Sequence, residues 1–176
     1  DIATFEGVRG NQLVGYGLVV GLNGSGDGSQ SAFTPQSLAN MLRRLGIVVD
    51  PAKVRVKNVA GVMVTAEVPP FARRGRTIDV TVSSLGDAKS LSGGTLLMTP
   101  LRGPDGEAYA SAQGQVSVGG AFSASAGGST TQRNHPTAGR IPSGALLERD
   151  IVYSLAGRDS LRLLIKDPDF TTAARI

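Results

Sequence analysis

Apolar and polar residues alternate along most of the chain, a pattern that predicts β-strands. The alternation has a period of two in residues 12–22, 53–68 and 77–85. Residues 95–101 and 108–118 flank the turn sequence Gly-Pro-Asp-Gly at 103–106, which indicates a β-hairpin. Two shorter apolar runs, 144–152 and 161–166, predict two further strands. The pattern therefore favours a chain built mainly from strands.

One segment has the period of a helix instead. Thr34 is suited to the N-cap, and Pro35 to the first helical position. Apolar residues recur at helical spacing at positions 38, 41, 42 and 45, and Gly46 supplies a stop. We predict a capped helix from residue 34 to residue 45. A second helix is expected to start near residue 167 and to be cut short at the end of the sequence.

The strand predicted over residues 12–22 carries glycine on one face. Gly15, Gly17 and Gly21 share this face with Leu13 and Val19, whereas the other face carries full-sized side chains. A face of bare backbone lets another chain segment approach closely. The three glycines are therefore predicted at a close contact, either within the molecule or between neighbouring subunits.

The strand predicted over residues 53–68 carries a row of positive charge. Lys53, Arg55 and Lys57 share one face of it. The row has two interpretations: a solvated sheet face, or a contact surface for an acidic partner. Its sequence leaves both open.

The fold class expected from these elements is α+β, with antiparallel or mixed β-sheets and one long capped helix, and a split into two subdomains as an alternative. Residues 119–140 contain a single large apolar residue, Phe122, and are predicted to be a long mobile loop. The expected organisation is a main α+β domain over 1–118, this loop, and further strands over 141–176 that pack on the main domain.

The loop after the first long strand resembles several ligand-binding loops in its composition. It has the sequence Gly-Leu-Asn-Gly-Ser-Gly-Asp-Gly at 21–28. Gly21 and Gly26 have the spacing of a phosphate-binding loop, but Asp27 occupies the position of the lysine. A calcium loop fails because its twelfth residue is Thr34 instead of glutamate. Ser25 lacks the flanking glycines of a nucleophile elbow. A flexible loop is the better interpretation.

Other candidate sites are equally weak. His135, the single histidine, has no cysteine or second histidine to share a metal with, and Glu148 and Asp150 are better explained as solvated carboxylates. We therefore predict no catalytic residue, no cofactor and no metal site. The formal charge of +4 is spread along the chain, and tryptophan is absent, so neither nucleic-acid binding nor sugar stacking is indicated. No apolar run reaches membrane-spanning length, so membrane insertion is not expected.

Several long segments resemble one family. These are "DIATFEGVRGNQLVGYGLVVGLNGSGD", "TPQSLANMLRRLGI", "NVAGVMVTAEVPPF", "SLGDAKSLSGGTLLMTPL" and "GRIPSGALLERDI". Together they are similar to the flagellar basal-body P-ring protein family, in order from residue 1 to about residue 170. The resemblance implies that the chain is the N-terminal half of a mature, secreted protein whose signal peptide has been removed.

The resemblance also implies a function and partners. It implies a non-enzymatic, structural subunit in the periplasm, many copies of which form a ring around the flagellar rod at the peptidoglycan layer. The implied partners are other copies of the chain, the rod, the L-ring protein, peptidoglycan and a periplasmic P-ring assembly chaperone. Two alternatives stay open: a peptidoglycan-anchoring carbohydrate-binding module without ring function, and a binder of an anionic ligand.

A ring that holds a rotating shaft gives the basic residues a predicted role. Long-range charge interactions vary smoothly with rotation, and lysine forms fewer fixed bidentate contacts than arginine. Lys57 and Lys89 lie within or beside the segments that most resemble the family. They are the leading candidates to face acidic groups on the rod, with Lys53 and Arg55 as further candidates. Ordinary solvated lysines are the alternative interpretation.

Overall fold

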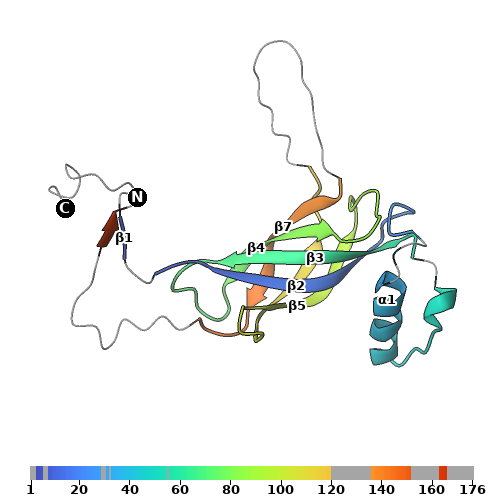
Figure 1. The fold of residues 1–176 in the computed structure, drawn as a ribbon, viewed down its shortest axis with the longest axis horizontal. Helices are drawn as coiled ribbons and strands as arrows, with labels where there is room; N and C mark the ends of the chain where they lie inside the picture. Colours follow the sequence, from blue (N-terminus) through green and yellow to red (C-terminus); the bar gives the residue numbers. More distant parts are fainter. Residues whose placement is uncertain are drawn as a thin grey trace, which may run out of the picture.

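The computed structural model describes residues 3–5, 8–28, 31, 33–54, 56–119, 136–151 and 163–165. Its elements follow the chain in the order β1 (Ala3–Phe5), β2 (Asn11–Val20), α1 (Phe33–Arg44), the 3₁₀ turn η1 (Pro51–Lys53), β3 (Val59–Val68), β4 (Thr77–Ser84), β5 (Thr95–Arg102), β6 (Ala108–Gln115), β7 (Ala138–Leu147) and β8 (Leu163–Ile165). Figure 1 shows the long strands wound around one another in the centre, with α1 against one side.

Six of these strands form a closed barrel in the order β2-β3-β4-β7-β6-β5. Every pair of neighbours is antiparallel, including β2 with β5, which closes the barrel. Closure leaves no free strand edge in the barrel that could pair with another chain. The remaining two strands, β1 and β8, form a separate two-stranded sheet (Figure 1).

The barrel interior is the main hydrophobic core. Alternate residues of each strand point inward, as the period of two dictates. On β4, for example, Ile78, Val80 and Val82 are buried, while Thr77, Asp79 and Thr81 between them are exposed. The core also includes large buried side chains from other strands: Leu13, Val62, Val64, Leu96, Leu101, Ile141 and Leu147.

Glycine occupies the interior face of β2. Its inward positions are Leu13, Gly15, Gly17 and Val19, and the apolar outward residues Val14 and Tyr16 are exposed. A Cβ at Gly15 would lie 2.5 Å from the carbonyl oxygen of Pro100 and 2.9 Å from a methyl carbon of Leu101. The missing side chains thus make room for β5, whose register against β2 is irregular between Val14 and Val19.

Helix α1 packs on the outside of the barrel. Leu38 and Met41 on its inner face contact a small second core that includes Leu18 and Val59. The helix stops where Gly46 adopts a φ of +85°, which glycine reaches without strain. The hydroxyl of Thr34, inside the first turn, bonds to the side chain of Asp27.

The register gives the barrel two distinct ends. At the proximal end the chain enters at Asn11 and leaves after Leu147, beside the turns 69–76 and 103–107. At the distal end lie the loop 21–28, residues 56–58, the segment 85–94 and residues 116–119 and 136–137.

The expected α+β class is wrong. Within the described residues the protein is mostly β-structure, with a closed six-stranded antiparallel barrel and one twelve-residue α-helix. The alternation located most of the long strands, but an open sheet and a closed barrel share that alternation. Six of them bury their apolar faces against one another, so the helix covers only a local patch outside the barrel.

Several element boundaries also differ from the expectation. Lys53 lies in η1 and Lys57 in the turn before β3, so the predicted basic row on a strand face does not form; Arg55 is outside the described residues. Strand β7 starts at Ala138, inside the range predicted as a mobile loop, and it is an integral strand of the barrel. The hairpin predicted over 95–118 is confirmed as β5 and β6. Residue 122 and the helix expected near 167 lie outside the described residues.

Candidate functional site

The loop 21–28 at the distal end is folded into one defined conformation by bonds to neighbouring segments. Gly21, Asn23 and Gly24 all have positive φ angles, which turn the chain sharply after β2. The side-chain oxygen of Asn58 accepts a hydrogen bond from the backbone N–H of Gly24 at 2.7 Å. The hydroxyl of Ser25 donates to the carbonyl oxygen of Leu22 at 2.7 Å. The loop is therefore not the flexible segment that its composition indicates.

Asp27 connects this loop to three other parts of the chain. Its side chain is 1% exposed. One carboxyl oxygen accepts from the hydroxyl of Thr34 in α1 at 2.5 Å and from the backbone N–H of Gly61 in β3 at 2.8 Å. The other oxygen accepts from the backbone N–H of Ala88 at 3.0 Å. Buried polar groups are tolerated when they are hydrogen-bonded in this way, and here the bonds join helix, strand and loop.

A second carboxyl group supports the same region from its surface. Asp87 accepts hydrogen bonds from the hydroxyl of Ser31 and the backbone N–H of Gly28, both at 2.7 Å. Donation by Ser31 and then by Gly28 lowers the pKa of Asp87, because both bonds favour the ionised form. The stabilising contribution of Asp87 is thus present above the ordinary carboxyl pKa and is lost as the pH falls through the lowered value.

The loop 21–28 brings two of the predicted basic residues together. The backbone N–H of Lys89 donates to the carbonyl oxygen of Ser25 at 2.8 Å. The next residue, Gly26, donates its N–H to the carbonyl oxygen of Lys57 at 2.8 Å. Lys57 and Lys89 are 32 positions apart in the sequence. They flank the same two-residue stretch of the loop, and the side chains of both are exposed.

We call Lys57 and Lys89 the distal lysine pair. Ion pairs within the described part of the chain involve Arg73, Arg140 and Arg149, and neither lysine of the pair takes part in one. Lys53 is also exposed but lies apart in η1. The pair therefore presents two positive charges to solvent from a fixed backbone.

Two glycines of the distal end are required for space. A Cβ on Gly26 would lie 2.5 Å from the carbonyl oxygen and 2.6 Å from the nitrogen of Val59. A Cβ on Gly86 would collide with the carboxyl group of Asp27. By contrast, a Cβ on Gly21 would have space, since the nearest atom is a carbonyl oxygen at 3.9 Å. Glycine is required at position 21 because the backbone there has a φ of +86°. A role of Gly15, Gly17 and Gly21 at a subunit interface stays a prediction.

Two shallow grooves lie on the outer surface of the described residues. One, of about 620 Å³, runs beside Glu67, Arg76, Asp79 and Arg140 near the proximal end. The other, of about 330 Å³, lies between α1 and β5 and is lined by Tyr16, Met41 and Met98. The ring of Tyr16 stands edge-on to Phe33 at 6.4 Å, and its hydroxyl donates to Ser37. Tyr16 is therefore held in place by the protein itself.

The two carboxyl groups considered as a candidate pair have other partners in the described residues. No group of three or more acidic, histidine or cysteine side chains could hold a metal ion there. Glu148 and Asp150 accept hydrogen bonds from Ser111 and from the backbone N–H of Arg74 instead of facing each other. His135 lies outside the described residues. Within the same part of the chain, the one α-helix lacks the length and apolar character needed to span a bilayer.

Sequence comparisons identify the family. A family model described as "Flagellar P-ring protein" matches residues 1–176. Proteins named "Flagellar P-ring protein" from Geobacter sulfurreducens and Aquifex aeolicus are each 62% identical to the chain over 176 residues. A "Flagellar P-ring protein 2" from Chromobacterium violaceum is 58% identical over 177 residues. The matches cover 99–100% of the chain but 48% of each relative, so the chain spans about half the length of the curated relatives it matches. The chain belongs to the flagellar P-ring protein family.

Proposed function

We propose that the chain is part of a structural subunit of the flagellar P ring, and that the distal lysine pair faces acidic groups on the rod that turns inside this ring. Membership of the family supports the first half of the proposal. The second half rests on one observation: Ser25 and Gly26 hold the backbones of both lysines at one point of the distal end.

Charge suits a surface that must guide a moving partner. Closely interdigitated apolar surfaces have discrete packing minima, and each minimum would resist rotation. A charge interaction changes slowly over the Debye length, about 8 Å at physiological salt, so its energy varies little as the partner turns. Lysine is suitable because its hydrated ammonium group sits on a flexible stem and forms few fixed bidentate bonds.

A rigid backbone beneath flexible side chains fits the same task. The bonds to Ser25 and Gly26 keep the lysine backbones in place, while the exposed stems follow the partner. Lys53 and Arg55 remain further candidates for rod contacts. The other proposed associations are with neighbouring copies of the chain, the L-ring protein, peptidoglycan and an assembly chaperone, in the periplasm.

Charge reversal tests the proposal in the full-length protein. Lys57→Asp and Lys89→Asp each replace an exposed side chain, so we expect normal folding and export. Ring assembly around the rod, measured as rings per isolated basal body and as swimming, should fall with either change and fall furthest with both.

A matched control is Arg76→Asp, which makes the same charge change at an exposed position of the proximal end. This variant should assemble rings normally. Normal rings and swimming in the Lys57→Asp, Lys89→Asp double variant would overturn the proposed role of the lysines. The family assignment does not depend on that outcome.

A further inference from the structure

The two-stranded sheet of β1 and β8 is incomplete as a structural unit. Ala3 pairs with Ile165, Thr4 with Leu164 and Phe5 with Leu163, in antiparallel register. In Figure 1 this sheet stands apart from the barrel, which closes on itself without it. A two-stranded sheet of three pairs has too few interactions to be stable alone in water. Within the described residues, each of its strands has one paired edge and one open edge.

Both faces of this small sheet expose an apolar side chain. Phe5 is 47% exposed and Leu164 is 50% exposed. They belong to adjacent pairs of the register, so their side chains point to opposite faces. A sheet with apolar residues on both faces is typical of the interior of a domain that has a further layer on each side.

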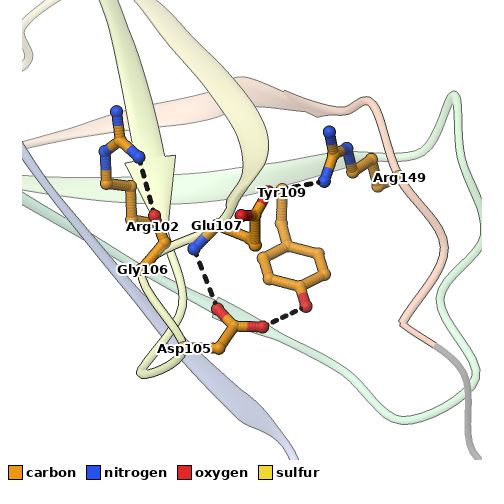
Figure 2. A network of polar contacts seen from close by, with 6 residues as sticks. All are labelled: Arg102, Asp105, Gly106, Glu107, Tyr109 and Arg149. Carbon is orange, nitrogen blue, oxygen red and sulfur yellow. Dashed lines mark hydrogen bonds and ion pairs between the residues drawn. The ribbon is translucent and has the colours of Figure 1, made fainter.

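Hydrogen bonds and an ion pair anchor the chain at the proximal end, where it leaves the barrel. Glu148 and Arg149 donate backbone hydrogen bonds to the carbonyl oxygen of Tyr109. The side chain of Arg149 forms an ion pair with Glu107 at 2.9 Å, and Asp150 accepts from the backbone of Arg74 at 2.7 Å. Figure 2 shows Arg149 and Glu107 joined beside the hairpin turn, where Asp105 also binds the hydroxyl of Tyr109.

These bonds fix the point where the chain leaves the barrel. It leaves at the same end at which it enters at Asn11, but on the opposite side of the barrel, because β2 and β7 are three strands apart in the strand order. A domain whose entry and exit points lie at the same end can be inserted into another domain, because both connections then face that domain. The barrel thus has the topology of an insertion between β1 and β8.

We propose that β1 and β8 are the first two strands of a larger sheet in a second domain, completed by the polypeptide that the full-length relatives have in addition to this chain. The relatives are about twice as long, so the additional chain that they have is long enough to form a further domain. The second domain would then be discontinuous, with β1 contributed from before the barrel. The alternative is that a second copy of this chain covers the sheet, and the experiment distinguishes the two cases.

Hydrogen exchange on two proteins tests this inference: the 176-residue chain and the full-length protein, both as monomers. Backbone amides of Phe5 and Leu164 should exchange at least about 100-fold more slowly in the full-length protein, independent of protein concentration. The amides of β4 and β7 should be protected equally in both and serve as the internal control.

Three results would overturn the inference. Equal, fast exchange of β1 and β8 in both proteins would mean that nothing in the full-length protein covers the sheet. Barrel-like protection in the 176-residue chain would mean that the sheet needs no cover. Protection that rises with the concentration of the 176-residue chain would identify a second copy as the occupant.

Substitutions give a second measurement. Leu164→Asp should lower the thermal unfolding midpoint of the full-length protein and leave that of the 176-residue chain unchanged. Val48→Asp, at a position that is 81% exposed on the barrel domain, should change neither. An unchanged midpoint for Leu164→Asp in the full-length protein would contradict a buried sheet.

Discussion

The two ends of the barrel are held together by different kinds of interaction. At the distal end, the buried carboxyl group of Asp27 and a set of backbone hydrogen bonds join the loop to α1, β3 and the segment 85–94. At the proximal end, exposed ion pairs such as Arg149–Glu107 accompany the backbone bonds. Both arrangements fix the direction of the backbone, but they contribute by different amounts to the free energy of folding. Exposed ion pairs contribute little to the free energy of folding. In the buried network of the distal end, by contrast, removing one hydrogen-bond partner leaves a buried polar group unsatisfied, which costs more free energy.

This contrast matches the two roles proposed for the ends. The distal end would keep its shape while its lysines contact a moving partner. The proximal end would orient the connection to the rest of the polypeptide. This role requires a defined backbone direction but little contribution to stability. Substitutions at the two ends should therefore have effects of different size.

The largest effect is expected for Asp27→Ala. It leaves the Thr34 hydroxyl and the N–H groups of Gly61 and Ala88 without their acceptor in a buried site. We expect a loss of about 3–5 kcal/mol in the free energy of unfolding, measured by urea denaturation.

Asp27→Asn sharpens this prediction. Both carboxyl oxygens accept a backbone N–H, so the NH₂ of an asparagine must face one of the two donors. The asparagine variant should lose roughly half as much stability as the alanine variant. Wild-type stability for Asp27→Asn would contradict the view that this residue holds the distal end together.

A smaller effect is expected for Gly26→Ala. Its Cβ would press on the backbone of Val59, which cannot move without disturbing β3. The expected cost is about 2–3 kcal/mol. Gly24→Asn is the matched control in the same loop, because Gly24 has a φ of +85° and open space around it, and asparagine tolerates the left-handed region. Equal losses for the two variants would show that space at Gly26 is not the constraint.

The smallest effect is expected at the proximal end, for Tyr109→Phe. The hydroxyl of Tyr109 donates to Asp105, and this bond is the main reason why the pKa of Asp105 lies below its ordinary value of 3.8. The same bond raises the pKa of Tyr109. The variant should bring the pKa of Asp105 back toward 3.8, as measured by NMR titration.

The sign of the pH dependence follows. Because the folded-state pKa of Asp105 is lowered, its contribution is present above the ordinary carboxyl value and is lost as the pH falls through the lowered value. In Tyr109→Phe, the stability lost on acidification should be smaller than in the wild type. The stability at neutral pH should change little, because the groups are exposed. An unchanged Asp105 pKa in the variant would contradict the assigned cause.

The sequence predicts the strands well because each barrel strand has one buried face. β2, β4, β5 and β6 lie close to their expected ranges, since an inward residue such as Val80 alternates with an outward one such as Thr81. Barrel closure could not be predicted in the same way. It depends on the pairing of β2 with β5 and on the insertion of β7, and these contacts connect residues far apart in the chain.

The order of the distal end is not predictable from the sequence, because its residues have more than one interpretation. Gly26 and Gly86 look like loop flexibility, but they are constrained by the backbone of Val59 and by Asp27. Asp27 argued against a phosphate loop, and nothing local indicated that it would be buried. The resemblance to the family is what indicates Lys57 and Lys89 as candidates. Their approach to the same loop residues is a long-range feature that residue spacing does not encode.

The most direct test of the account is the salt dependence of binding between the full-length protein and isolated flagellar rods. If the distal lysine pair faces acidic groups, binding should weaken steadily as salt is raised, because the Debye length shortens. The double variant Lys57→Gln, Lys89→Gln should bind more weakly at low salt and should show a clearly flatter salt dependence. Wild-type affinity and an unchanged salt dependence in the double variant would contradict the account.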